Sequence, residues 1–169
     1  YSCHNWQTLG SGWSRSPYAA LYTSLGCPYA CHFCCIQSPF KEGDQLKKSL
    51  SLADGTQVPI KPQNSYRLWP PDRVGQQIAD LHHKHGVKVF KVADEMFVLN
   101  RRHVLGVCDE IERRIKAPQE NLNIWAYARV DTCNDQELLH RMRRAGFHWL
   151  CLGIESASAE VRDGVDKGY

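Results

Sequence analysis

The spacing of hydrophobic residues divides most of the chain into strands that alternate with helices. Short apolar runs have the length of buried strands, and between them hydrophobic residues recur three and four positions apart, as in amphipathic helices. The strands are expected at 19–24, 87–93, 122–130 and 147–154. The clearest helical face consists of Val104, Val107, Cys108, Ile111 and Ile115. This alternation is typical of a parallel α/β sheet.

Local signals place the helix ends. Pro71 suits the first turn of a helix that Gly86 ends, and Asn134 with Glu137 three residues later resembles a capping box. The expected N-caps of the later helices are Asn100, Asn134 and either Ser156 or Ser158. The polar stretch 37–66 has no sustained period, and we interpret it as an insertion beside the functional site.

These elements predict a partial (β/α) TIM-like barrel of about four βα units, truncated at the C-terminus. The chain begins without methionine and stops as a fourth helix starts, so we expect an internal fragment. Residues 1–17 are interpreted as a linker from an upstream domain, and 18–169 as the N-terminal part of the core domain. Chemistry in such barrels sits at the C-terminal strand ends. The polar strand ends at 27–34, 94–95, 129–131 and 155–156 should therefore meet.

Composition narrows the class of protein. Hydrophobic residues make up 43% and charged residues 23%, as in a globular chain, and no apolar run reaches the roughly 18 residues of a membrane span. The net charge of +3 is too small to indicate nucleic-acid binding. Four of the eight cysteines crowd into nine residues, which argues against a disulfide framework and for a reduced, cytoplasmic setting. Cys108, Cys133 and Cys151 are interpreted as small packing residues, and so are the scattered tryptophans.

Cys27, Cys31 and Cys34 offer three thiolates in one short loop. A structural zinc site and an ordinary [4Fe-4S] cluster each need four ligands, so three leave one metal position open. The alternative is a zinc-stabilised, non-catalytic binding module in which His32, Cys35 or Cys133 completes the tetrahedron. The paired spacing of zinc ribbons is missing.

The segment 22–35, YTSLGCPYACHFCC, resembles the CxxxCxΦC signature of the radical SAM superfamily. The segments ADEMFVLN at 93–100, WAYARVD at 125–131 and GIESAS at 153–158 are similar to strand ends of the same superfamily. The likeness is greatest to the subgroup with a cobalamin-binding domain ahead of the barrel.

This resemblance implies a [4Fe-4S] cluster on the three cysteines and S-adenosylmethionine (SAM) on the fourth iron. Reductive cleavage of SAM would yield a 5′-deoxyadenosyl radical that abstracts hydrogen from a small organic substrate, with flavodoxin or ferredoxin as electron donor. The expected enzyme is a cobalamin-dependent methyltransferase, with a cyclase or another rearranging enzyme as the alternative. An upstream domain would bind the cobalamin.

The resemblance also assigns cofactor contacts. Phe33 would lie near the adenine, or else anchor the loop in the core. Asp94 or Glu95 would bind the methionine amino group. This sequence has Ala-Asp-Glu where many members have Gly-Gly-Glu, so which carboxylate does so is open, and both could instead be capping or solvated charges.

Two further strand ends complete the expected cradle. Arg129 would pair with the methionine carboxylate, or alternatively with Asp131. Glu155 and Ser156 resemble the position that hydrogen-bonds the ribose, although both could serve only to cap the next helix.

Overall fold

A four-stranded parallel sheet is the centre of the computed structural model, which describes residues 17–29, 31, 34–35, 49–51, 57–59 and 66–164. Its strands are β1 (Tyr18–Leu21), β6 (Val89–Val92), β7 (Asn123–Ala128) and β8 (Phe147–Leu152), hydrogen-bonded in that order. All three pairings are parallel. The predicted α/β sheet is therefore confirmed, with each strand two or three residues shorter than the apolar run that predicts it.

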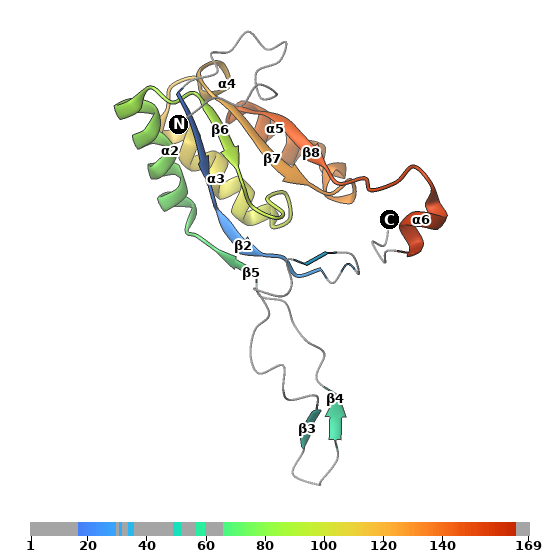
Figure 1. Ribbon diagram of the computed structural model, residues 1–169. Coiled ribbons are helices and arrows are strands. Elements are labelled where there is room, and N and C mark those ends of the chain that lie inside the picture. Colours follow the sequence, from blue (N-terminus) through green and yellow to red (C-terminus); the bar gives the residue numbers. More distant parts are fainter. Residues whose placement is uncertain are drawn as a thin grey trace.

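Three helices cover one face of this sheet (Figure 1). They are α2 (Pro71–His85), α3 (Arg101–Arg114) and α5 (Gln136–Arg144). Their apolar faces meet the sheet in one buried cluster that includes Ile78, Phe90, Ile111, Ile124 and Met142. Three shorter elements lie in the connections. Helix α4 (Pro118–Asn121) precedes β7, a 3-10 turn at Asp131–Asn134 follows β7, and α6 (Ala159–Gly164) follows β8.

The predicted helix ends are largely confirmed. Gly86 ends α2 in the left-handed conformation (φ 66°), and the Asn100 side chain accepts a hydrogen bond from the His103 amide at 3.0 Å. The third helix was predicted one residue too early. Its N-cap is Asp135, which accepts from the Leu138 amide at 3.0 Å. Asn134 belongs to the preceding 3-10 turn, so it cannot also start the helix.

The first predicted strand, 19–24, is divided in two. β1 ends at Leu21, and β2 (Ser24–Gly26) joins a separate antiparallel pair with β5 (Tyr66–Leu68). The break occurs where the Thr23 amide donates to a carboxylate oxygen of Asp94 at 2.6 Å. A side chain thus takes the donor that a continuous ladder would use.

The polar insertion contains more regular structure than the sequence indicates. β3 (Ser49–Ser51) pairs antiparallel with β4 (Gln57–Pro59), and Tyr66 begins β5. The rest of the insertion lies outside the described residues.

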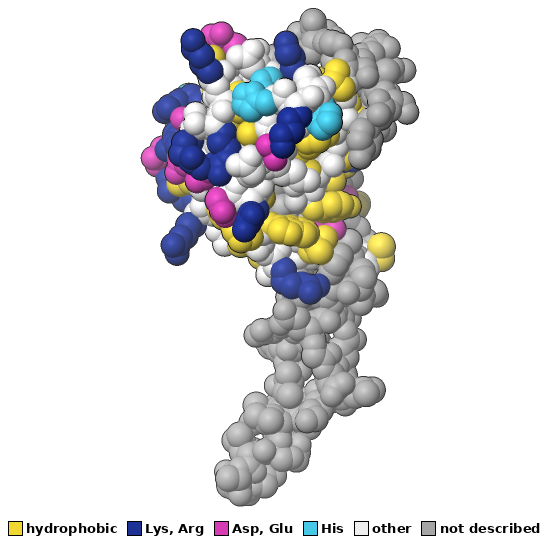
Figure 2. Space-filling view, turned by 90° about the vertical axis from the view of Figure 1, so that its left-hand side faces the viewer, with side chains coloured by type: hydrophobic (Ala, Val, Ile, Leu, Met, Phe, Trp, Pro, Cys, Tyr) yellow, Lys and Arg dark blue, Asp and Glu magenta, His cyan; other side chains and the backbone are white. Residues whose placement is uncertain are grey.

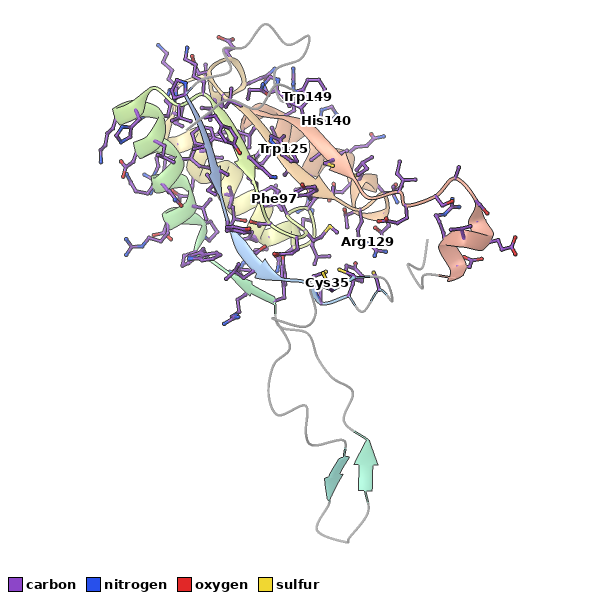
Figure 3. All side chains as sticks on the ribbon, viewed as in Figure 1. Cys35, Phe97, Trp125, Arg129, His140 and Trp149 are labelled. Carbon is purple, nitrogen blue, oxygen red and sulfur yellow. The ribbon has the colours of Figure 1, made fainter. Side chains whose placement is uncertain are left out.

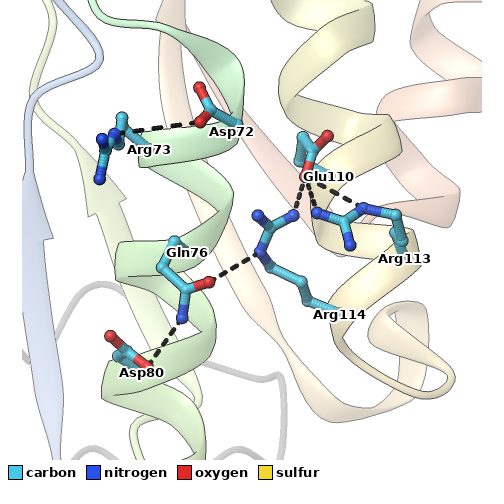
Figure 4. Close-up of polar contacts among 7 residues, drawn as sticks. All are labelled: Asp72, Arg73, Gln76, Asp80, Glu110, Arg113 and Arg114. Carbon is cyan, nitrogen blue, oxygen red and sulfur yellow. Dashed lines mark hydrogen bonds and ion pairs between the residues drawn. The ribbon is translucent and has the colours of Figure 1, made fainter.

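Close approach of α2 and α3 depends on two glycines. A Cβ on Gly75 would lie 2.5 Å from Glu110 Cβ, and one on Gly106 would lie 2.8 Å from Pro71 Cγ. Around this crossing, polar side chains connect the two helices, because Arg114 Nε donates to Gln76 Oε1 at 3.3 Å while its guanidinium also pairs with Glu110 (Figure 4). The crossing fixes the position of α3, whose N-terminal turn lies beside the polar strand ends.

The outer face over the helices is rich in charge. Figure 2, which views the molecule from the α2 side, shows basic side chains with acidic ones among them, and hydrophobic side chains gathered toward the lower end of the described part. Exposed Leu68 and Trp69 belong to β5 and the turn into α2. Within the described part of the chain, no helix is both long enough and apolar enough to cross a membrane.

Candidate cofactor site

A cavity of about 400 Å³ lies at the C-terminal ends of the parallel strands. The loops after β2, β6, β7 and β8 supply its walls, so residues up to 128 positions apart in sequence meet there. Most of the residues that the sequence singles out line it: Cys27, Cys31, Cys34, Asp94, Glu95, Arg129 and Glu155.

The three cysteines enter the cavity from a single tight loop. All three cysteines are half-buried, and the Cys34 amide donates to the Cys31 carbonyl at 3.1 Å, which holds these two residues together. Burial raises the pKa of the Cys27 thiol, and the neighbouring Cys31 and Cys34 add to that rise. Cys35 is exposed and does not line the cavity, as expected for the neighbour of a residue that does.

The other cysteines behave differently from one another. Burial raises the pKa of the Cys108 thiol to about 12, which fits its predicted packing role. Cys133 donates its thiol to the Arg129 carbonyl at 3.3 Å and is not among the cavity residues. Cys151 is exposed and lines the cavity, so its interpretation as a packing residue is wrong.

Asp94 is fully buried and holds the chain that leads into the cysteine loop. Its carboxylate accepts from the Thr23 amide and the Thr23 hydroxyl, each at 2.6 Å, and from the Ser24 hydroxyl at 2.7 Å. Because the Thr23 hydroxyl donates its one proton to Asp94, the nearby His103 Nε2, 3.0 Å away, must donate to that hydroxyl. A buried network therefore connects the junction of β1 and β2, the end of β6 and the first turn of α3.

Glu95 has a freer carboxylate than Asp94. It is partly exposed, lines the cavity, and accepts one hydrogen bond from the Gly26 amide at 3.1 Å through Oε2. Of the two acidic residues, Glu95 is thus the one placed to meet a cationic group in the cavity.

Arg129 forms the ion pair that the sequence left as an alternative. Its Nε lies 2.9 Å from Asp131 Oδ1, and its Nη2 donates to Oδ2 at 3.0 Å. These bonds hold the pKa of Asp131 below its usual range. The guanidinium also lies over the ring of Tyr29 in the cysteine loop, 4.1 Å from the centroid, so Arg129 connects that loop with the end of β7.

Of the two residues predicted at the end of β8, Glu155 lines the cavity and Ser156 does not. Glu155 has φ 64°, a left-handed conformation that is costly for a residue with a side chain. The Ser156 hydroxyl accepts from the Ser158 amide at 3.1 Å. Ser158 in turn caps α6. Phe33 lies outside the described residues.

Sequence reasoning missed several residues that line the cavity, namely Tyr29, Met96, Tyr127 and Cys151. A signal for two of them was present. Side chains alternate along a strand, so Tyr127 shares a face with Arg129, and its register partner Cys151 lies beside it.

The chain belongs to the radical SAM superfamily, whose family model matches residues 21–169. The class expected from the cysteine motif is therefore confirmed. Members of this superfamily use a [4Fe-4S] cluster and SAM.

Two curated relatives cover most of the chain. It is 32% identical over 154 residues to an uncharacterized methyltransferase of Pyrococcus horikoshii, covering 90% of this chain and 27% of that protein. It is 29% identical over 142 residues to the anaerobic magnesium-protoporphyrin IX monomethyl ester cyclase of Cereibacter sphaeroides, covering 84% of this chain and 19% of that protein. The chain thus spans about a quarter or less of these relatives.

A solved structure has the same fold. The radical SAM methyltransferase TsrM of Kitasatospora setae, solved with cobalamin and a [4Fe-4S] cluster bound, superposes with a TM-score of 0.65 at 20% identity. The match covers 92% of this chain and 24% of that structure. It supports the partial barrel predicted from the strand–helix alternation.

Proposed function

We propose that this chain forms the cluster-binding and SAM-binding core of an enzyme that reductively cleaves SAM. The observation that carries the proposal is the cavity in which Cys27, Cys31 and Cys34 stand beside Glu95, Arg129 and Glu155. The cavity has the size of a small-molecule site and lies at the strand ends where barrels place their chemistry.

The donor set fits a [4Fe-4S] cluster. In such a cluster each thiolate binds a different iron, so the three sulfurs need not converge on one point. Among the described residues, no group of three His, Cys, Asp or Glu side chains is close enough to hold a single metal ion. Engagement of Cys133 with the Arg129 carbonyl also argues against Cys133 as a fourth zinc ligand.

When bound, the cluster and SAM would supply one-electron cleavage of the sulfonium and a 5′-deoxyadenosyl radical that takes hydrogen from the substrate. Glu95 would accept the ammonium of the methionine part. Arg129, fixed by Asp131, would face its carboxylate, and Glu155 would accept from the ribose hydroxyls. Asp94 would hold the cysteine loop in place without touching the cofactor, because three donors already occupy its carboxylate.

The remaining cradle residues are assigned from the resemblance alone. Phe33 would pack near the adenine, and Ser156, together with Glu155, would hydrogen-bond the ribose hydroxyls.

The finer reaction proposed is methyl transfer that uses cobalamin bound by another part of the protein. The Pyrococcus methyltransferase and the TsrM structure support it, whereas the magnesium-protoporphyrin ester cyclases support radical ring formation as the second candidate. SAM with a deuterated methyl group separates the two, because only methyl transfer moves the label into the product. A cytoplasmic setting and a flavodoxin or ferredoxin donor belong to the same proposal.

The central test is anaerobic reconstitution of the full-length protein with iron and sulfide. We expect close to four irons per chain and 5′-deoxyadenosine after reduction with SAM. Cys31→Ala should lose both signals, while Cys35→Ala, a change of the same type at an exposed position four residues away, should keep them. One stoichiometric zinc with no iron in the purified protein would refute the proposal.

A further inference from the structure

The sheet face opposite the helices carries a row of side chains directly beneath the cofactor cavity. Strand register places Ala20 beside Lys91, Lys91 beside Trp125, and Trp125 beside Trp149. We call these four residues the Lys91 row. Tyr127 lies two positions further along β7, about 7 Å away, and lines the cavity itself. The row is therefore continuous with the cavity through Tyr127.

Lys91 has an unusual environment for an ammonium group. Its Nζ lies 4.8 Å from the ring centroid of Trp125 and 5.5 Å from that of Tyr127. Among the described residues, no carboxylate forms an ion pair with it. Ring faces compensate a half-buried charge only in part, because their attraction is weaker than that of a carboxylate. The position thus favours a negatively charged group brought by a ligand.

Trp149 provides a flat apolar surface next to this charge. Trp149 is 49% exposed, although it stands on the sheet face opposite the helices and beside buried Trp125. Figure 3 shows both tryptophans further from the cysteine loop than Arg129. Ala20, at the other end of the row, is small and exposed, which leaves space beside Lys91. A planar ring could therefore lie against Trp149 while its acidic substituent reaches the ammonium.

We propose that the Lys91 row binds the substrate, and that this substrate is a flat conjugated ring bearing a carboxylate. Lys91 would bind the carboxylate as a point charge, and Trp149 would stack on the ring. A ring bound to the Lys91 row lies within reach of the cofactor cavity, because Tyr127, two positions further along β7 than Trp125, lines that cavity. This assignment deepens the proposed function and rests on it.

Equilibrium dialysis of three probes against the full-length, reconstituted protein tests the proposal. The probes are 2-naphthoate, its uncharged isostere 2-naphthamide, and cyclohexanecarboxylate, an anion without a flat ring. We expect 2-naphthoate to bind at least about tenfold more tightly than either of the others, because only it satisfies both the charge and the stacking surface.

Variants at Lys91 and Trp149 separate the two contributions, and a variant at Lys88 serves as the control. Lys91→Met should remove the preference for naphthoate over naphthamide, and Lys91→Arg should restore part of it. Trp149→Ala, at a half-exposed position, should weaken both naphthalene probes to a similar extent. Lys88→Met, at an exposed lysine three residues before Lys91 and just ahead of β6, should change none of the three affinities.

Equal binding of naphthoate and naphthamide by the unchanged protein would overturn the proposal, and so would a preference that survives Lys91→Met. If Lys91→Met fails to fold, the probe comparison on the unchanged protein and on Trp149→Ala still decides. Iron content and 5′-deoxyadenosine formed without substrate are measured on the same preparation. If the protein holds a normal cluster and cleaves SAM but does not prefer naphthoate, only this inference is refuted. If it prefers naphthoate but holds no cluster or does not cleave SAM, the proposed function is refuted.

Discussion

Replacing Asp94 with alanine is expected to loosen β1 and the start of the cysteine loop. The carboxylate is fully buried and is the acceptor for three donors, the amide and hydroxyl of Thr23 and the hydroxyl of Ser24. Alanine removes every one of these acceptors. Because the donors lie in a packed region, they would be left without partners.

The size of the effect follows from the number of donors. Each buried donor without an acceptor costs about 1–3 kcal/mol, and relaxation of the two hydroxyls reduces the sum to about 3–5 kcal/mol. Since about 1.4 kcal/mol corresponds to a factor of ten, local opening should become at least about a hundredfold more frequent. Asp94→Asn keeps one carbonyl acceptor, so its effect should be about tenfold.

Hydrogen–deuterium exchange of the full-length protein, freed of iron, measures this opening in peptides covering 18–26. Asp72→Ala is the matched control, because that carboxylate is 59% exposed and lies 3.9 Å from its arginine. It should leave these peptides unchanged. Exchange in Asp94→Ala within twofold of the unchanged protein would show that the carboxylate does not hold this segment.

Three further results are expected. Burial lowers the pKa of His103, so the fold favours the neutral imidazole. The stability that this preference contributes is fully present above about pH 6.5 and is lost as the pH falls through the lowered pKa. His103→Gln should therefore flatten the pH dependence of hydrogen–deuterium exchange in peptides covering 18–26. Gly75→Ala should lower the free energy of unfolding by about 1–3 kcal/mol in urea titrations, because its Cβ would meet Glu110 Cβ, whereas Gln77→Ala on the exposed face should change it little. Glu155→Gly should relieve about 1 kcal/mol of backbone strain and raise the melting temperature slightly while weakening SAM binding in dialysis; a loss of stability would contradict the conformational reasoning.

Much of the fold could be predicted because its determinants are local. Periodic hydrophobic positions indicate each strand and helix, and Pro71, Gly86 and Asn100 mark helix ends through backbone chemistry within one turn. The first predicted strand was wrong because a distant group competes for its backbone. Asp94 takes the Thr23 amide and ends β1 early, although the two residues are 71 positions apart.

The candidate site divides in the same way. The cysteine motif is contiguous, so the sequence alone indicates a cluster and the superfamily. It also predicts which strand ends meet, because parallel strands share one edge. It does not determine which polar side chain is already engaged.

Cys27, Cys31 and Cys34 therefore mark the same site in the sequence and in the structure, since their spacing depends only on a short loop. The tertiary structure decided the rest. It assigned Asp94 to the buried network, left Glu95 facing the cavity, paired Arg129 with Asp131, and set Lys91 among aromatic rings. The physical reason is that the partners of a charged or polar side chain are fixed by strand register and helix packing, which bring together residues that no local pattern connects.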